Sequence, residues 1–146
     1  MDIRKLQAKE TAPMALLLLA DPSLESIQSY LGQGECYLAQ DLGVYVLLPL
    51  DQETIELKNV AVAPEAQGRG LGQQLISHAL KIAKNAGFKR MEVGTGNSSV
   101  GPLRLYQKMG FKQTSVDHEF FIRHYPMPIF ENGIQCRDMI RLAKDL

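Results

Sequence analysis

Hydrophobic positions along the chain follow two periods, one typical of helices and one typical of strands. In residues 71–85 apolar side chains recur three and four positions apart, which predicts an amphipathic helix that ends at Gly87. Residues 55–62 alternate at first and are then continuously apolar, which predicts a central strand whose far end is buried on both faces. Shorter segments predict strands at residues 3–6, 35–40, 44–48, 90–93, 111–116 and 136–142, and helices at residues 13–20 (N-cap Thr11), 23–31 and 102–109.

The length of the chain, 146 residues, is usual for one domain, and neither an internal repeat nor a linker is evident. The order of elements therefore predicts a single mixed α/β domain over residues 1–146. No apolar run is long enough to span a bilayer and the first residues lack the apolar part of a secretion signal, so we expect a cytoplasmic protein without a membrane partner. Cys36 and Cys136 are expected to be buried thiols, and no metal is expected because neither has a second ligand at metal-binding spacing.

The net charge of zero conceals an uneven distribution of charged side chains. Residues 1–66 hold four basic and ten acidic side chains, a balance of −6, whereas residues 67–112 hold eight basic side chains against one acidic one, a balance of +7. A local positive excess concentrates anionic ligands, although a solvated, Lys-rich helix face would give the same count. Nucleic-acid binding through this segment is the weakest interpretation, because neither a recognition helix nor an aromatic stacking platform is evident.

A glycine-rich loop follows the predicted central strand, with the sequence Gln-Gly-Arg-Gly-Leu-Gly at residues 67–72. Alternating glycines let the backbone turn sharply, and their N–H groups together with a helix N-terminus suit a diphosphate. The spacing differs from the dinucleotide fingerprint, and no Gly-Lys-Ser/Thr of a P-loop follows. The alternative is a tight strand–helix turn that needs glycine only for packing.

Two motifs in this order resemble the signature of the GNAT N-acetyltransferase superfamily. The first is Val-Ala-Val-Ala-Pro-Glu at residues 60–65 followed by the glycine-rich loop, and the second is Leu-Tyr-Gln-Lys-Met-Gly-Phe at residues 105–111. Residues 120–133, with Phe-Phe at the start and Pro-Ile-Phe-Glu-Asn-Gly at the end, resemble a subset of bacterial acetyltransferases of unclear substrate. The resemblance implies an acyl-CoA N-acyltransferase fold: a twisted, mostly antiparallel sheet with a splayed pair of parallel strands, flanked by helices.

The resemblance also implies acetyl-CoA as co-substrate, held largely by backbone groups. A bulge around residues 60–62 would splay the strand so that its backbone pairs with pantetheine, with the N–H of Val62 on the thioester carbonyl. Arg69 and Lys108 would each contact a phosphate or lie in solvent. Either Asn97 or Ser99 would contact pantetheine, since Ser99 rather than Asn97 keeps the family's offset from the tyrosine. The cofactor-binding residues so implied are Val60, Ala61, Val62, Gln67, Gly68, Arg69, Gly70, Leu71, Gly72, Asn97, Ser99 and Lys108.

Two side chains are candidates for catalysis. Tyr106 matches the family tyrosine that protonates the leaving thiolate, and its alternative role is to cap the core with its hydroxyl in water. Glu56 is the candidate base that removes a proton from the amine, because it lies six residues before Val62 and the period of two predicts the same face. Its alternative is a surface carboxylate. No positioned cysteine nucleophile is evident, so direct attack in a ternary complex is expected.

The acceptor is expected to be a primary amine, either a small molecule or a peptide amine. The acidic first part of the chain favours a cationic acceptor such as a polyamine, an aminoglycoside or a lysine. The side chain of His78 is expected to be exposed to solvent. A homodimer is a candidate assembly of the chain. A polar and aromatic cluster where acceptor loops often lie comprises His118, Glu119, Phe121, His124 and Tyr125. A non-catalytic acyl-CoA sensor of the same fold is the alternative function, although a sensor needs neither Tyr106 nor Glu56.

Overall fold

Residues 2–146 are described by a computed structural model, and they divide into two units. The first unit runs to Met91 and also includes Leu146, and the second is Glu92–Asp145. The first contains β1 (Arg4–Lys5), α1 (Met14–Ala20), α2 (Leu24–Leu31), β2 (Glu35–Ala39), β3 (Gly43–Pro49), β4 (Thr54–Val62), the 3-10 turn η1 (Pro64–Ala66) and α3 (Leu71–Asn85). Strand β5 (Arg90–Gly96) leads into the second, which contains α4 (Val100–Lys108), β6 (Lys112–Asp117), α5 (Phe120–His124), β7 (Ile129–Glu131), β8 (Ile134–Cys136) and β9 (Met139–Asp145).

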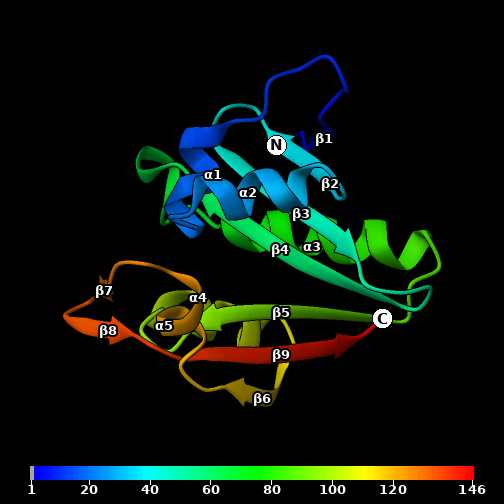
Figure 1. Cartoon of the computed structure of the whole chain (residues 1–146). Helices are drawn as coiled ribbons and strands as arrows, with labels where there is room; N and C mark the ends of the chain where they lie inside the picture. Colours follow the sequence, from blue (N-terminus) through cyan, green and yellow to red (C-terminus); the bar gives the residue numbers. More distant parts are fainter. Residues whose placement is uncertain (1) are drawn as a thin grey trace. The chain divides into compact units, whose positions relative to one another are not determined.

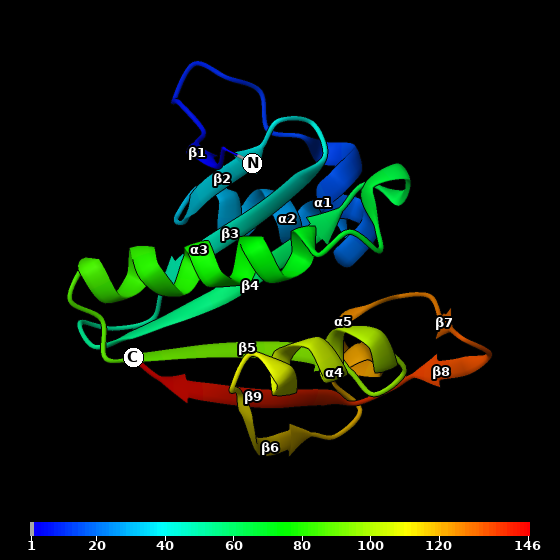
Figure 2. The same cartoon turned by 180° about the vertical axis from the view of Figure 1, so that it is seen from behind.

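The first unit is a three-layer arrangement. Strands β1 to β4 pair with their sequence neighbours in antiparallel fashion. Helices α1 and α2 cover one face of these strands (Figure 1), and α3 covers the other (Figure 2). The predicted amphipathic stripe of α3 is confirmed, since its buried residues are Leu71, Leu75, Ile76, Ala79 and Ala83.

Helix α3 packs closely against the glycine at the start of β3. A Cβ at Gly43 would lie 3.0 Å from Cδ1 of Leu75 and 3.2 Å from Cδ2 of Leu71. Gly43 therefore leaves room for these two leucine side chains of the helix.

Strands β4 and β5 begin side by side within the first unit. The N–H groups of Lys89 and Arg90 both donate to the carbonyl of Glu53, at 2.8 and 3.1 Å. Both strands run in the same direction from this point, and they are neighbours in the strand order of the sheet. The predicted fold class is confirmed: a mixed α/β fold whose mostly antiparallel sheet contains one parallel pair and is flanked by helices.

The pairing of β3 with β4 contains a bulge at Lys58. Val46 pairs with Asn59 and Leu47 pairs with Leu57, so Lys58 has no partner in β3. The prediction that the far end of β4 is buried on both faces is wrong, because burial there alternates from residue to residue.

In the second unit the strand order is β5-β9-β6, and β6 pairs with β9 in antiparallel fashion. Strand β5 extends three residues beyond the predicted end at residue 93, because its glycines pack closely rather than turn the chain. A Cβ at Gly94 would lie 2.6 Å from Sδ of Met139, and one at Gly96 would lie 2.4 Å from Sγ of Cys136. The α5 helix and the β7–β8 hairpin were not predicted.

Helix ends also differ locally from the predictions. Pro13 rather than Thr11 is the N-cap of α1, and its carbonyl accepts from the N–H groups of Leu16 and Leu17. Helix α4 begins two residues before the predicted start. Cys36 and Cys136 are buried free thiols, as expected. None of the helices in residues 2–146 has the length and apolar character needed to cross a bilayer.

Candidate functional site

The connection between β4 and α3 presents a series of backbone N–H groups. Gly68 and Gly70 both adopt a φ of +79°, the left-handed region that glycine favours. Among residues 2–146, no atom beyond the adjoining residues lies within 4 Å of the position that a Cβ would take at either glycine, so the packing alternative is wrong for these two positions. The amide of Gln74 donates to Gly70, while the N–H groups of residues 68–72 find no acceptor in the part of the chain that the structure describes. Unpaired amides at a helix N-terminus form an anion-binding cup.

The end of β4 aims backbone groups away from β3. The N–H of Ala63 donates to the carbonyl of Leu42 at 2.7 Å. From there back to Val60, each residue of β4 pairs with one residue of β3 without interruption. Hydrogen-bonded and non-hydrogen-bonded pairs alternate in an antiparallel ladder, so the N–H and C=O groups of Val60 and Val62 point away from β3. The side chain of Gln67 donates to the carbonyl of Val62 at 3.1 Å, which ties the loop to the strand end.

Glu56 and Val62 lie on opposite faces of β4, so the predicted shared face is wrong. The bulge lies at Lys58 rather than around residues 60–62, and its extra residue between the two positions breaks the period of two. The register places Glu56 on the face that carries Asn59 and that α1 and α2 cover, whereas Val62 belongs to the face that α3 covers.

The carboxylate of Glu56 is buried, which excludes the interpretation of a surface side chain. Glu56 is 7% exposed, and its Oε2 lies 3.8 Å from Nζ of Lys58. The same ammonium lies 5.7 Å from the ring centroid of Tyr30 in α2. Removing an unpaired carboxylate from water would be costly, and the lysine supplies a compensating charge.

Asn59 connects β4 to both covering helices. Its Nδ2 donates to the carbonyl of Leu17 at 3.1 Å and to the hydroxyl of Tyr30 at 2.9 Å, and that hydroxyl donates to Asp21. Its Oδ1 is buried and has no partner among the described residues. This network fixes the segment between α1 and α2 against the bulged strand.

The side chain of His78, in α3, packs against tyrosines of the sheet, so the prediction of a solvated ring is wrong. Its Nδ1 lies 2.6 Å from the hydroxyl of Tyr45, whose ring stacks on Tyr37 at 4.8 Å. His78 follows the buried Leu75 by three positions, which places it on the edge of the buried stripe. Partial burial lowers the pKa of the imidazole, with a smaller contribution from the charge of Lys81.

In the second unit, α4 carries Tyr106 on its buried face. The side chain is 6% exposed and meets Phe111 edge-on, with ring centroids 6.0 Å apart. Burial raises the pKa of the hydroxyl above its ordinary value, so the phenol stays protonated at neutral pH. Within residues 2–146 no hydrogen bond involves this hydroxyl, which leaves its proton available to a ligand. Lys108 is exposed in the last turn of the same helix.

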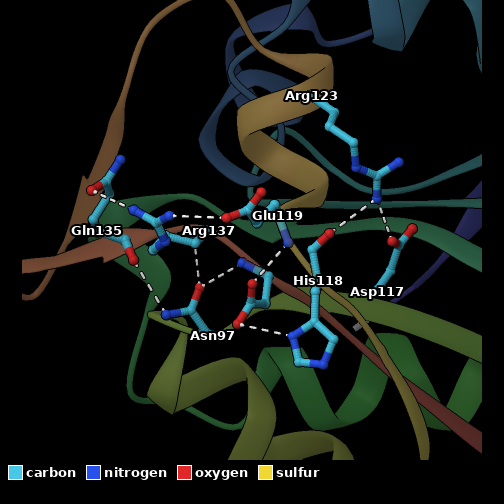
Figure 3. Close-up of polar contacts among 8 residues, drawn as sticks. Asn97, Asp117, His118, Glu119, Arg123, Gln135 and Arg137 are labelled. Atoms are coloured by element: carbon cyan, nitrogen blue, oxygen red, sulfur yellow. Dashed lines mark hydrogen bonds and ion pairs between the residues drawn. The ribbon is translucent and has the colours of Figure 1, made fainter.

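The amide of Asn97 binds the end of β8 and the residues that join it to β9 (Figure 3). Its Oδ1 accepts from the backbone N–H groups of Arg137 at 2.7 Å and Asp138 at 3.0 Å, and its Nδ2 donates to the carbonyl of Gln135 at 3.2 Å. Ser99, the N-cap of α4, donates its hydroxyl to Oε1 of Glu131 at 3.0 Å. Both candidates for the pantetheine contact thus have protein partners within the second unit.

The predicted polar and aromatic cluster surrounds α5. The N–H of Glu119, whose φ is +59°, donates to Oδ1 of Asp138 at 2.9 Å. The ring of His118 points toward the same carboxylate, with Nδ1 3.9 Å from Oδ2 (Figure 3). The rings of Phe121 and Tyr125 are neighbours, with centroids 5.4 Å apart. The cluster is therefore tied to the start of β9.

Sequence reasoning missed Glu131 and Asn132, which contact the turn before α4. Oε1 of Glu131 accepts from the hydroxyls of Ser98 and Ser99, and Nδ2 of Asn132 donates to the carbonyl of Ser98 at 3.1 Å. The Asn-Gly dipeptide at residues 132–133, between apolar positions, is a strong hairpin signal that could have located them.

Comparisons with known proteins give a consistent family assignment. A family model described as Acetyltransferase (GNAT) family matches residues 10–111. The chain is 53% identical to Uncharacterized N-acetyltransferase YvbK of Bacillus subtilis over 135 residues, which cover 90% of this chain and 87% of that protein. A crystal structure of a GNAT family acetyltransferase from Elizabethkingia anophelis with acetyl-CoA bound superposes with a TM-score of 0.96 at 49% identity, covering 99% of this chain and 97% of the other. A structure named IAA acetyltransferase from Bacillus cereus gives a TM-score of 0.95 at 50% identity, covering 99% of both chains.

Proposed function

Because this chain belongs to the acetyltransferase (GNAT) family, we propose that it transfers an acetyl group from acetyl-CoA to a primary amine by direct attack in a ternary complex. The observation that carries the proposal is the set of unpaired backbone N–H groups at residues 68–72, around two left-handed glycines in open space. The relative from Elizabethkingia anophelis with acetyl-CoA bound supports acetyl-CoA as the co-substrate.

In this proposal the first unit binds the cofactor through its backbone. The amides from Gln67 to Gly72 bind the pyrophosphate, with Arg69 as an added charge. The groups of Val60 and Val62 that point away from β3 pair with the amides of pantetheine, much as an added strand would. The N–H of Val62 then donates to the thioester carbonyl and stabilises the oxyanion that forms during attack.

Two side chains perform the proton transfers. A neutral amine attacks the thioester carbon, the C–S bond breaks, and Tyr106 donates its proton to the departing thiolate. Glu56, directly or through water, takes the proton that the amine loses on attack. The buried, protonated phenol of Tyr106 supports the first assignment, and the buried carboxylate of Glu56 supports the second.

Binding and turnover test the proposal separately. Calorimetry with CoA and with acetyl-CoA measures binding to the complete chain. Thiol release from acetyl-CoA, followed with a chromogenic thiol reagent, measures turnover with spermidine, kanamycin, lysine and IAA, the last because a relative is named for it. Both cysteines are buried, so a reaction without acetyl-CoA gives the small background from the protein.

We expect CoA binding and thiol release with at least one of the three amines in the panel, spermidine, kanamycin and lysine. Binding without release for the whole panel would favour the sensor function instead. If the folded chain binds neither CoA nor acetyl-CoA, the proposal is wrong.

A further inference from the structure

The tip of the β7–β8 hairpin contacts the turn that precedes α4. Its two-residue loop, Asn132 and Gly133, has φ values of +54° and +74°, which fits the tight turn that Asn-Gly favours. This geometry presents Glu131 to the hydroxyls of Ser98 and Ser99, which are 0% and 9% exposed. The contact joins residues 32 positions apart in the sequence and lies entirely within the second unit.

Helix α4 lacks the usual local support at its N-terminus. Its N-cap, Ser99, makes no side-chain capping bond, and no acidic residue lies in its first turn. Gly101 and Pro102 occupy that turn, and glycine is a poor helix former. The carboxylate of Glu131 supplies from the hairpin what the helix lacks, since a negative charge near a helix N-terminus is stabilising.

The position of α4 determines where Tyr106 lies. Tyr106 follows Ser99 by seven residues, which is two helical turns and about 10 Å along the axis, so the two side chains lie on the same face. The N–H of Leu103 donates to the carbonyl of Ser99 at 3.1 Å, which joins the clamped residue to the helix. A displacement of the turn is therefore transmitted to the tyrosine.

We propose that Glu131 is a positioning residue that acts through Ser99 and α4 on Tyr106. This inference rests on the proposed role of Tyr106 as the proton donor. It also explains the Pro-Ile-Phe-Glu-Asn-Gly segment: apolar strand positions build the hairpin, Asn-Gly turns it, and the glutamate clamps the helix. In the same way, the side chain of Asn97 bonds to the backbone of residues 135, 137 and 138.

A double-mutant cycle tests the inference, with thiol release from acetyl-CoA measured for each amine of the panel above. Glu131→Ala is expected to lower kcat about tenfold, with the KM for acetyl-CoA changed less than about twofold, because misplaced groups lose much of their rate contribution. In the Tyr106→Phe background the same substitution should lower kcat less than about twofold, because no acid is left to position. An equal loss in both backgrounds would overturn the inference, as would an unchanged kcat in Glu131→Ala alone.

Two further variants separate positioning from folding. Glu131→Gln keeps an oxygen that accepts from Ser99 and should retain most of kcat, whereas Ser99→Ala should resemble Glu131→Ala; the reverse order would contradict the inference. Asp117→Ala is the matched control, since it removes a carboxylate of the same unit that pairs with Arg123 rather than with the α4 turn.

Hydrogen exchange keeps the two proposals distinguishable. If Tyr106→Phe leaves turnover unchanged, Tyr106 is not the proton donor. The contact between Glu131 and the turn before α4 is then tested on its own, by amide hydrogen exchange in residues 103–106. Glu131→Ala should accelerate exchange there at least about tenfold, because the clamp is lost and local opening becomes easier. Unchanged exchange would overturn the clamp itself.

Discussion

The groups that we propose to act on acetyl-CoA are held in opposite ways in the two units. In the first, the backbone amides come from consecutive residues of one loop, 67–72. Open space surrounds the left-handed glycines of this loop. In the second, Tyr106 is a buried side chain on a helix whose start is held by a carboxylate 32 residues further along. A backbone site tolerates side-chain change but not loss of glycine, whereas a side-chain site depends on distant contacts.

The largest expected effect concerns the side-chain site. Tyr106→Phe should lower kcat by about 100-fold, because general acid catalysis of thiolate departure is lost. Calorimetry should find CoA affinity within about twofold of the unsubstituted chain, since the ring and its contact with Phe111 remain. A kcat that survives the substitution would show that Tyr106 serves packing only.

The backbone site should respond to a single methyl group. Gly70→Ala places a Cβ at a φ of +79°, where an L-residue is strained by about 1–2 kcal/mol, so we expect CoA affinity to fall about tenfold as the loop rearranges. The matched control is Gly32→Ala, at a φ of −69° with ordinary neighbours at 3.9 Å. Equal affinities for CoA in both variants would contradict the role of the left-handed turn.

Packing within the second unit gives the next effect. Gly96→Ala brings a methyl group to 2.4 Å from Sγ of Cys136, and overpacking of this kind should lower the free energy of unfolding by about 1–3 kcal/mol. Denaturant unfolding measures the change. Adding Cys136→Ala should recover part of the loss because it removes the clashing atom, and strictly additive destabilisation would argue against this contact.

The smallest expected effect is a pH dependence in the first unit. The pKa of His78 is lowered from its ordinary value of 6.5 by burial, so the unfolded chain binds the proton more readily than the folded one. Stability is therefore full above that value and declines as the pH falls below it. The melting temperature between pH 7.5 and 5.5 should fall more steeply in the unsubstituted chain than in His78→Gln. Parallel curves would contradict a lowered pKa of His78 in the folded chain.

What could be predicted from sequence depended on whether the signal was local. The stripe of α3 and the loop that precedes it are encoded by neighbouring residues, so both were predicted. The glycines of β5 predicted a loop because their partners, Met139 and Cys136, lie forty or more positions away in the sequence. The faces of Glu56 and Val62 were wrong because a one-residue bulge has no strong signal of its own.

The sequence by itself determined the family and the glycine-rich loop, because each is carried by a short motif, and it offered Tyr106 and Glu56 as candidates for catalysis. The tertiary structure decided what surrounds them: the lysine beside Glu56, the tyrosine that binds His78, and the hairpin that supports α4. Such contacts join residues far apart in the chain, and their energies depend on distance and burial, which a linear pattern does not contain.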